Sequence, residues 1–286
     1  MTSLTLDQFR SLKNLPSLPE QVDNVLKYLE TSSSMDYSIM EMIQYDPTMA
    51  AAVLRTANMP IYGFPRQVSS LQQAEALLGP GTIKNIILRT PILEKFLKNS
   101  SVSIDYIQLW IHSGITATLS GSLARLIGGI ESDVSFTLGL IHEVGTMALS
   151  VYSPDSFIKV QKHSNENNTS LIEAEKQILG FSHFDIAEVM MDSWQFPPQL
   201  NQIILQCKDP DKNKTNFEIA GVVILAKLLA EEWGFPSTIK GTEYFERKKL
   251  LNMLRISEKN LEAWESELKK YAQFALNTMK TPQNKN

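Results

Sequence analysis

Residues 104–129 read IDYIQLWIHSGITATLSGSLARLIGG, and this stretch decides the fold class. Its apolar residues recur at the spacing of a helix, and the strict alternation that indicates a strand is absent. Two glycines, Gly128 and Gly129, then mark a helix end. The stretch predicts one long helix from about Ile104 to Ile127, and this helix carries His112.

The rest of the chain carries helical signals of the same kind on either side. Capping residues precede helix-spaced apolar segments at Asp46-Pro47, at Ser69-Ser70 and at Ser182. Glycines end two further segments, at Gly79 and at Gly180. Strand signals are nearly absent. The sequence of 286 residues therefore predicts an all-α fold of about twelve helices joined by short connectors.

One apolar segment contains two adjacent polar side chains that could carry chemistry. It reads GLIHEVG at residues 139–145. We expect it to lie inside one continuous helix capped by Asp133 or Ser135, with His142 and Glu143 in the middle. Both side chains would then have to find partners between packed helices.

Histidines and carboxylates that converge from separate helices are how helical hydrolases hold divalent metals. His112, His142 and His183 lie on three separate predicted helices, so a metal site is one interpretation. The other is that each is an ordinary histidine with satisfied hydrogen bonds. For His183, at the start of its helix, this means a ring in solvent or bonded to a loop. The fourth histidine, His163, lies in a polar segment and is expected to be exposed.

Composition excludes several other classes of function. The net charge of −4 and the short basic clusters at 247–249 and 269–270 do not form the basic surface that nucleic-acid binding needs. No run reaches the ~20 apolar residues of a membrane span, and the N-terminus shows no secretory signal. The single cysteine, Cys207, excludes an internal disulfide and is expected to be buried. We expect a soluble protein of the bacterial cytoplasm.

Eight short motifs form an ordered set along the chain. They lie at residues 15–19, 43–47, 53–58, 68–74 and 77–79 in the N-terminal half, and at 109–113, 139–145 and 194–197 in the second half. Over about residues 12–235 the sequence resembles the HDOD family, a relative of the HD-type phosphohydrolases. The resemblance implies a multi-helix HD-like bundle at 101–235, after an N-terminal helical subdomain at 1–100 and before a C-terminal helical tail at 236–286.

The resemblance also implies a site. HD enzymes hold metal with a distant His, an adjacent His-Asp pair and a later Asp; the matching positions here are His112, His142 with Glu143, and Lys227. A charged lysine has no lone pair, so Lys227 cannot replace a carboxylate ligand. It either pairs with Glu143 or extends to the rim of its helix. His183 could be an extra ligand of the kind that HD-GYP phosphodiesterases add. We predict that these five residues form a vestigial cluster, with no catalytic residue, no metal and no other cofactor.

For function, the resemblance implies a bacterial signal-transduction module that regulates or interacts without catalysis. Its partner would be another signalling protein or a small-molecule or nucleotide ligand, and not nucleic acid. No membrane span is expected. Two alternatives remain open. One is a metal-dependent phosphohydrolase with a degenerate site that uses His112, His142 and Glu143. The other is a sensor that binds a nucleotide or another small anion in the old catalytic cleft. The oligomeric state is not predicted.

Overall fold

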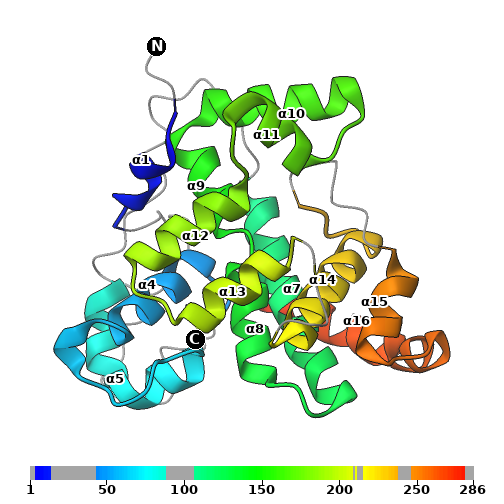
Figure 1. The fold of residues 1–286 in the computed structure, drawn as a ribbon. Helices are drawn as coiled ribbons and strands as arrows, with labels where there is room; N and C mark the ends of the chain where they lie inside the picture. Colours follow the sequence, from blue (N-terminus) through cyan, green and yellow to red (C-terminus); the bar gives the residue numbers. More distant parts are fainter. Residues whose placement is uncertain are drawn as a thin grey trace.

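The computed structural model describes residues 4–13, 43–87, 106–208, 210, 215–237 and 246–280. Every regular element in these ranges is a helix (Figure 1). They are α1 (Leu6–Arg10), α4 (Pro47–Ala57), the 3-10 helix η1 (Pro60–Tyr62), α5 (Leu71–Ile87), α7 (Tyr106–Ile127), α8 (Ser132–Ile141), α9 (Val144–Tyr152), α10 (Pro154–Asn167), α11 (Leu171–Leu179), α12 (His183–Ser193), α13 (Pro198–Gln206), α14 (Phe217–Glu232), α15 (Arg247–Leu254) and α16 (Glu258–Lys280). The all-α prediction is confirmed. Residues 14–42, which include the first of the family motifs, lie outside the described ranges.

Helix α7 lies near the centre of the fold, where it contacts α8, α14 and α16 (Figure 1). This is the long helix that the sequence predicts, and Gly128 ends it in the left-handed conformation at φ 79°. Small residues let α7 and α8 approach closely, because a Cβ added to Gly139 would lie 2.9 Å from the Cα of Ala117. The end of α8 is thereby held against the middle of α7.

The buried apolar side chains form two clusters. The larger extends from Phe9 of α1 through α4, α5 and α8–α13 to α14. The second joins α7 and α14 to α15 and α16, through side chains such as Ile115, Leu225 and Leu268. The C-terminal helices therefore pack on α7 and α14. The predicted subdomain boundary near residue 100 lies outside the described residues, and the division near residue 235 stays a prediction.

The helix starts predicted at Asp46 and Ser182 are confirmed. Asp46 Oδ1 accepts hydrogen bonds from the backbone N–H of Thr48 at 2.9 Å and of Met49 at 3.0 Å. Ser182 Oγ accepts from the backbone N–H of Asp185 at 3.4 Å, and the Asp185 carboxylate accepts from the backbone of Ser182 at 2.7 Å. Each cap satisfies backbone donors that the first helical turn leaves unpaired.

One prediction about the chain path is wrong, because residues 133–149 do not form a continuous helix. His142 and Glu143 form a break between α8 and α9. After this break, the first turn of α9 lies directly against α12. A Cβ added to Gly145 would lie 1.9 Å from the backbone oxygen of His183, so only glycine allows this approach. The change of direction brings α9 into contact with the start of α12.

Two smaller predictions nearby also need correction. Helix α8 follows Glu131 and not the predicted caps, Asp133 or Ser135; the Ser135 hydroxyl instead donates to the backbone oxygen of Glu131 at 2.8 Å. His163, expected to be exposed, lies on α10 and is half-buried, with Nε2 at 2.6 Å from Oε1 of Gln177. Neither difference changes the arrangement of the core helices.

Among the described residues, one segment is long and apolar enough by length and composition to cross a membrane. It is Ser132–Tyr152, which contains α8 and α9. Of its most apolar window, 89% is buried inside the fold.

Candidate functional site

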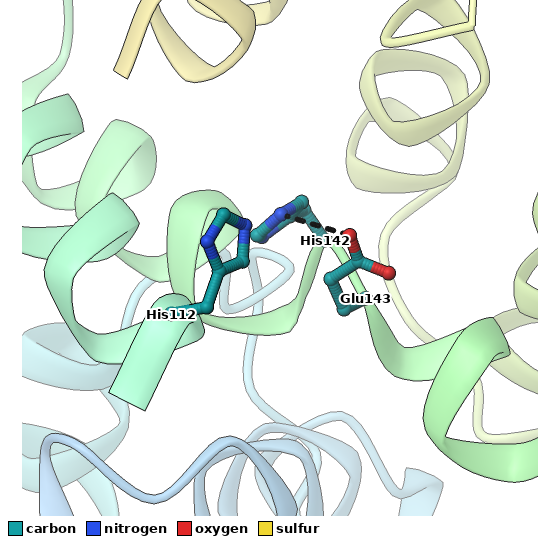
Figure 2. A group of neighbouring side chains, drawn as sticks. All are labelled: His112, His142 and Glu143. Atoms are coloured by element: carbon teal, nitrogen blue, oxygen red, sulfur yellow. Dashed lines mark ion pairs between the residues drawn. The ribbon is translucent and has the colours of Figure 1, made fainter. Parts of the chain in front are cut away.

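The candidate site lies where three parts of the fold meet (Figure 2). His112 extends from α7, and His142 and Glu143 extend from the break between α8 and α9. Lys227 approaches from α14. Consecutive side chains on a continuous helix do not face each other, so the break allows His142 and Glu143 to share one site. Four of the five predicted site residues therefore come together.

Both imidazole rings in the site are held by backbone carbonyl groups. His112 Nδ1 lies 2.7 Å from the oxygen of Phe235, and His142 Nδ1 lies 2.7 Å from that of Gly139. A carbonyl oxygen only accepts, so we assign the ring proton to Nδ1 and a lone pair to Nε2 in each histidine. Both Nε2 atoms are buried without a hydrogen-bond partner in the described part of the chain; that of His142 lies 3.5 Å from Oε1 of Glu143, the contact drawn as a dashed line in Figure 2. The ring centroids are 5.4 Å apart, so two unsatisfied acceptors share one small volume.

Burial keeps both histidines neutral. It lowers the pKa of His112 from 6.5 to about 4 and that of His142 from 6.5 to about 3. The negative charge of Glu143 favours protonation and the positive charge of Lys227 opposes it, but burial has the largest effect on both pKa values. Near neutral pH the two rings therefore offer lone pairs and carry no charge.

Glu143 and Lys227 form an ion pair inside the site. Lys227 Nζ lies 3.0 Å from Glu143 Oε1, and the two side chains are 23% and 4% exposed respectively. Burial opposes ionisation of Glu143, but the positive charge around it, that of Lys227 foremost, outweighs burial and holds the pKa of this carboxyl well below its usual value. Of the two interpretations of Lys227 from the sequence, the geometry shows pairing with Glu143.

An HD-type divalent metal would have to bind at this point. One ligand atom each of His112, His142 and Glu143 lies within 4.8 Å of the others, and the two bare Nε2 atoms suit a metal. The carboxylate does not, because an ammonium group already neutralises it and would repel a divalent cation. No further His, Cys, Asp or Glu among the described residues completes this group. The residues present therefore do not fit such a metal.

His183 lies nearby but is bound to a different carboxylate. It begins α12, and its buried ring places Nδ1 at 2.8 Å from Oε2 of Glu175 on α11. Its backbone N–H donates to the same oxygen at 2.9 Å. Burial lowers the pKa of His183, but the charge and hydrogen bond of Glu175 outweigh burial, so the pKa is raised above its ordinary value of 6.5. His183 is thus a charged partner of Glu175, and its ring does not lie in solvent.

Glu175 is the residue that sequence reasoning missed. Its side chain is fully buried on α11. It lies one helical turn after Leu171, on the face of the helix that packs inward. A carboxylate on such a face needs a partner, and this position was the available signal.

A pocket opens beside the ion pair of Glu143 and Lys227. Its volume is about 440 Å³ when the space open to solvent at its mouth is included. Its polar wall consists of His142, Glu143, His183, Lys227 and Glu231. Apolar side chains of α12 and α14 and the thiol of Cys207, which is buried as predicted, complete the wall. Four of the five predicted site residues therefore border one pocket, and His112 does not.

The helical bundle described above is of the HD-like all-α class. The HDOD domain family matches residues 15–210. The chain belongs to the HDOD family. An "Uncharacterized protein" of Treponema pallidum (strain Nichols) is 20% identical over 195 residues, which cover 67% of this chain and 37% of that protein. The chain thus spans little more than a third of that relative.

Several solved structures share the fold. The MmoQ response regulator from Methylococcus capsulatus str. Bath has a TM-score of 0.69 at 20% identity, covering 88% of this chain and 97% of that chain. A virulence factor from Campylobacter jejuni subsp. jejuni has a TM-score of 0.62 at 21% identity, covering 90% and 98%. An HDOD domain protein from Geobacter sulfurreducens has a TM-score of 0.57 at 20% identity, covering 96% of each chain. At these identities the likeness establishes the fold alone.

Proposed function

We propose that this protein is a signal-transduction regulatory module of the HDOD type that works by binding and not by catalysis. Membership of the family supports the regulatory role. The ion pair between Glu143 and Lys227 carries the claim about catalysis. A hydrolase of the HD type needs its carboxylates for a metal, and here the one carboxylate of the three-ligand group lies 3.0 Å from an ammonium group.

The same ion pair suits a structural role. Taking two charges out of water is costly unless each finds a close partner. Lys227 satisfies the buried Glu143 and itself remains in partial contact with solvent. The pair also ties α14 to the break between α8 and α9. In this proposal the vestigial cluster stabilises the bundle and no longer performs hydrolysis.

The partner in this proposal is another signalling protein or a small-molecule or nucleotide ligand in the bacterial cytoplasm. The structural neighbour MmoQ is named a response regulator, which supports a place in signalling. The pocket beside Lys227 supports a ligand, because charged and apolar groups line one concave space.

A second candidate function is metal-dependent phosphohydrolysis at a degenerate site. The two bare, buried Nε2 atoms of His112 and His142 favour it, because metal-binding histidines are held in the same way through Nδ1. This function requires Lys227 to leave Glu143.

Hydrolysis of bis(p-nitrophenyl) phosphate distinguishes the two candidates. We expect the full chain, supplied in turn with Mn²⁺, Fe²⁺ and Ni²⁺, to hydrolyse it no faster than the variant His142→Ala. His163→Ala is the matched control, because this histidine lies on α10 and contacts Gln177. Turnover that disappears in His112→Ala and His142→Ala but persists in His163→Ala would contradict the proposal and favour the hydrolase.

A further inference from the structure

The break between α8 and α9 and the facing side of α7 bring together more hydrogen-bond acceptors than donors. We propose that one ordered water molecule binds between His112 and His142, where an HD enzyme would hold its metal, and donates a hydrogen bond to Nε2 of each ring. The inference rests on the proposed function, since it takes this place to hold no metal.

Each of the two rings can only accept a hydrogen bond at Nε2. Nδ1 of His112 lies 2.7 Å from the oxygen of Phe235, and Nδ1 of His142 lies 2.7 Å from that of Gly139. Because a carbonyl oxygen cannot donate, the single proton of each neutral ring is on Nδ1. The lone pair of each Nε2 is then buried without a donor among the described residues.

The carboxylate beside the rings cannot supply that donor. His142 Nε2 lies 3.5 Å from Glu143 Oε1, and with the ring proton on Nδ1 both atoms are acceptors. Lys227 donates to Glu143 Oε1 at 3.0 Å, which satisfies the carboxylate and leaves the two ring nitrogens as they are. Buried acceptors without a donor destabilise a fold, so this place requires a group with two protons to donate.

The spacing of the two rings suits one water molecule. Their centroids are 5.4 Å apart, and one ligand atom of His112 lies within 4.8 Å of one of His142. Figure 2 shows the two rings next to each other. A water that donates two hydrogen bonds of about 2.8 Å at its tetrahedral angle joins acceptors that are about 4.6 Å apart. A single water therefore bridges rings that cannot bond to each other directly.

The surroundings favour a neutral donor over a cation. The positive charge of Lys227 opposes protonation of both His112 and His142, so its field reaches both rings. A metal or ammonium ion between the rings would meet the same repulsion. A hydroxyl group of a larger ligand has one proton and would satisfy one ring only. In addition, the ring of His112 is 0% exposed, which excludes a larger molecule and admits water.

A third hydrogen bond to the water is available from α7. Buried waters commonly make about three hydrogen bonds. Thr116 follows His112 by one helical turn, and its hydroxyl is buried and has no partner among the described residues. Its backbone oxygen lies 3.0 Å from the Cβ that Gly139 would carry, and Gly139 is the residue that holds His142. We expect the Thr116 hydroxyl to donate to the water, which then joins α7 to the break.

A high-resolution crystal structure of the full chain tests the inference. The protein is treated with EDTA and crystallised without ammonium salts, and half of the crystals are then soaked in Zn²⁺. We expect one density peak about 2.8 Å from Nε2 of both His112 and His142, with no anomalous signal before or after the soak. A metal would instead lie about 2.1 Å from each nitrogen.

Nuclear magnetic resonance of the full chain with labelled histidine provides a second measurement in solution. His112 and His142 should carry their proton on Nδ1, and magnetisation should pass from water to the ring proton beside Nε2 in both. His163 is the matched control with the opposite tautomer, because its Nε2 lies 2.6 Å from Oε1 of Gln177. His112→Phe removes one acceptor and should abolish the transfer to His142, whereas His163→Phe should leave it unchanged.

Three results would each overturn the inference: no density between the rings, an atom at metal distance from both nitrogens, or a proton on Nε2 of His112 or His142. The proposed function fails separately. Phosphodiester hydrolysis by a protein whose crystals show the water and no metal would remove the proposed function and leave the water site in place.

Discussion

The ion pair between Glu143 and Lys227 can be broken from either side, and the two sides should not cost the same. Lys227→Met strands a carboxylate that is only 4% exposed, and we expect the free energy of unfolding to fall by about 3–5 kcal/mol. Glu143→Gln leaves an ammonium on a side chain that is 23% exposed. This lysine can extend to water, so the expected fall is about 1–2 kcal/mol.

The double variant Glu143→Gln/Lys227→Met strands no charge. Its loss of stability should therefore be smaller than that of Lys227→Met alone. The expected coupling free energy between the two positions is about 2–3 kcal/mol. Urea denaturation followed by far-UV circular dichroism measures the free energy of unfolding of the wild type, the two single variants and the double variant. An unchanged slope of this free energy against urea concentration is the check that unfolding stays two-state.

Lys162 and Glu166 on α10 provide the matched control cycle. Their charged atoms lie 3.7 Å apart, and their side chains are 70% and 62% exposed. The same cycle at this surface pair should give a coupling below about 0.5 kcal/mol. A coupling as small as this between Glu143 and Lys227 would contradict a buried, structural role for the pair.

Gly145→Ala should lower the free energy of unfolding by about 3 kcal/mol or more, because its Cβ would lie 1.9 Å from the backbone oxygen of His183. Gly81→Ala is the control, and it should leave the free energy of unfolding unchanged in the same urea titration, because no atom lies within 4 Å of its Cβ. Stability should also fall by about 2 kcal/mol each for His112 and His142 between pH 6.5 and pH 5, because the unfolded rings take up protons there and the buried rings, with pKa values of about 4 and about 3, do not. The raised pKa of His183 does not offset this loss, since its contribution is fully present below pH 6.5 and is lost only at higher pH. Equal stability at both pH values would contradict the neutral, buried state of the two rings.

The helical fold could be predicted from the sequence because its signals are local. Asp46 caps α4 through backbone groups two and three residues away, and Gly180 ends α11 in the left-handed conformation. Such signals depend on the chain within one helical turn. They are therefore readable without any tertiary contact.

The break at His142 and Glu143 could not be predicted in the same way. The apolar pattern continues through it, and periodicity alone indicates one helix. The contact that accompanies the break joins Gly145 to the backbone of His183 on another helix. A glycine in the sequence shows that a close approach is possible and does not show what approaches.

The site was predictable only where the resemblance supplied positions. It pointed to His112, His142, Glu143 and Lys227, and the fold brings these four together. The partner of His183 was not predicted, because Glu175 lies on a different helix and pairs across a glycine turn. Buried ion pairs of this kind are set by helix packing, which no pattern along the chain encodes.

The amount of divalent metal held by the purified full chain shows whether Lys227 excludes a metal from the ligand group of His112, His142 and Glu143. After incubation with Mn²⁺, Fe²⁺ or Zn²⁺ and desalting, elemental analysis should find far less than one equivalent per chain, because Lys227 neutralises the carboxylate of the ligand group. Lys227→Asp, which removes the ammonium and adds a carboxylate, should retain more metal than the wild type. One equivalent bound by the wild type and lost in His142→Ala would contradict the account.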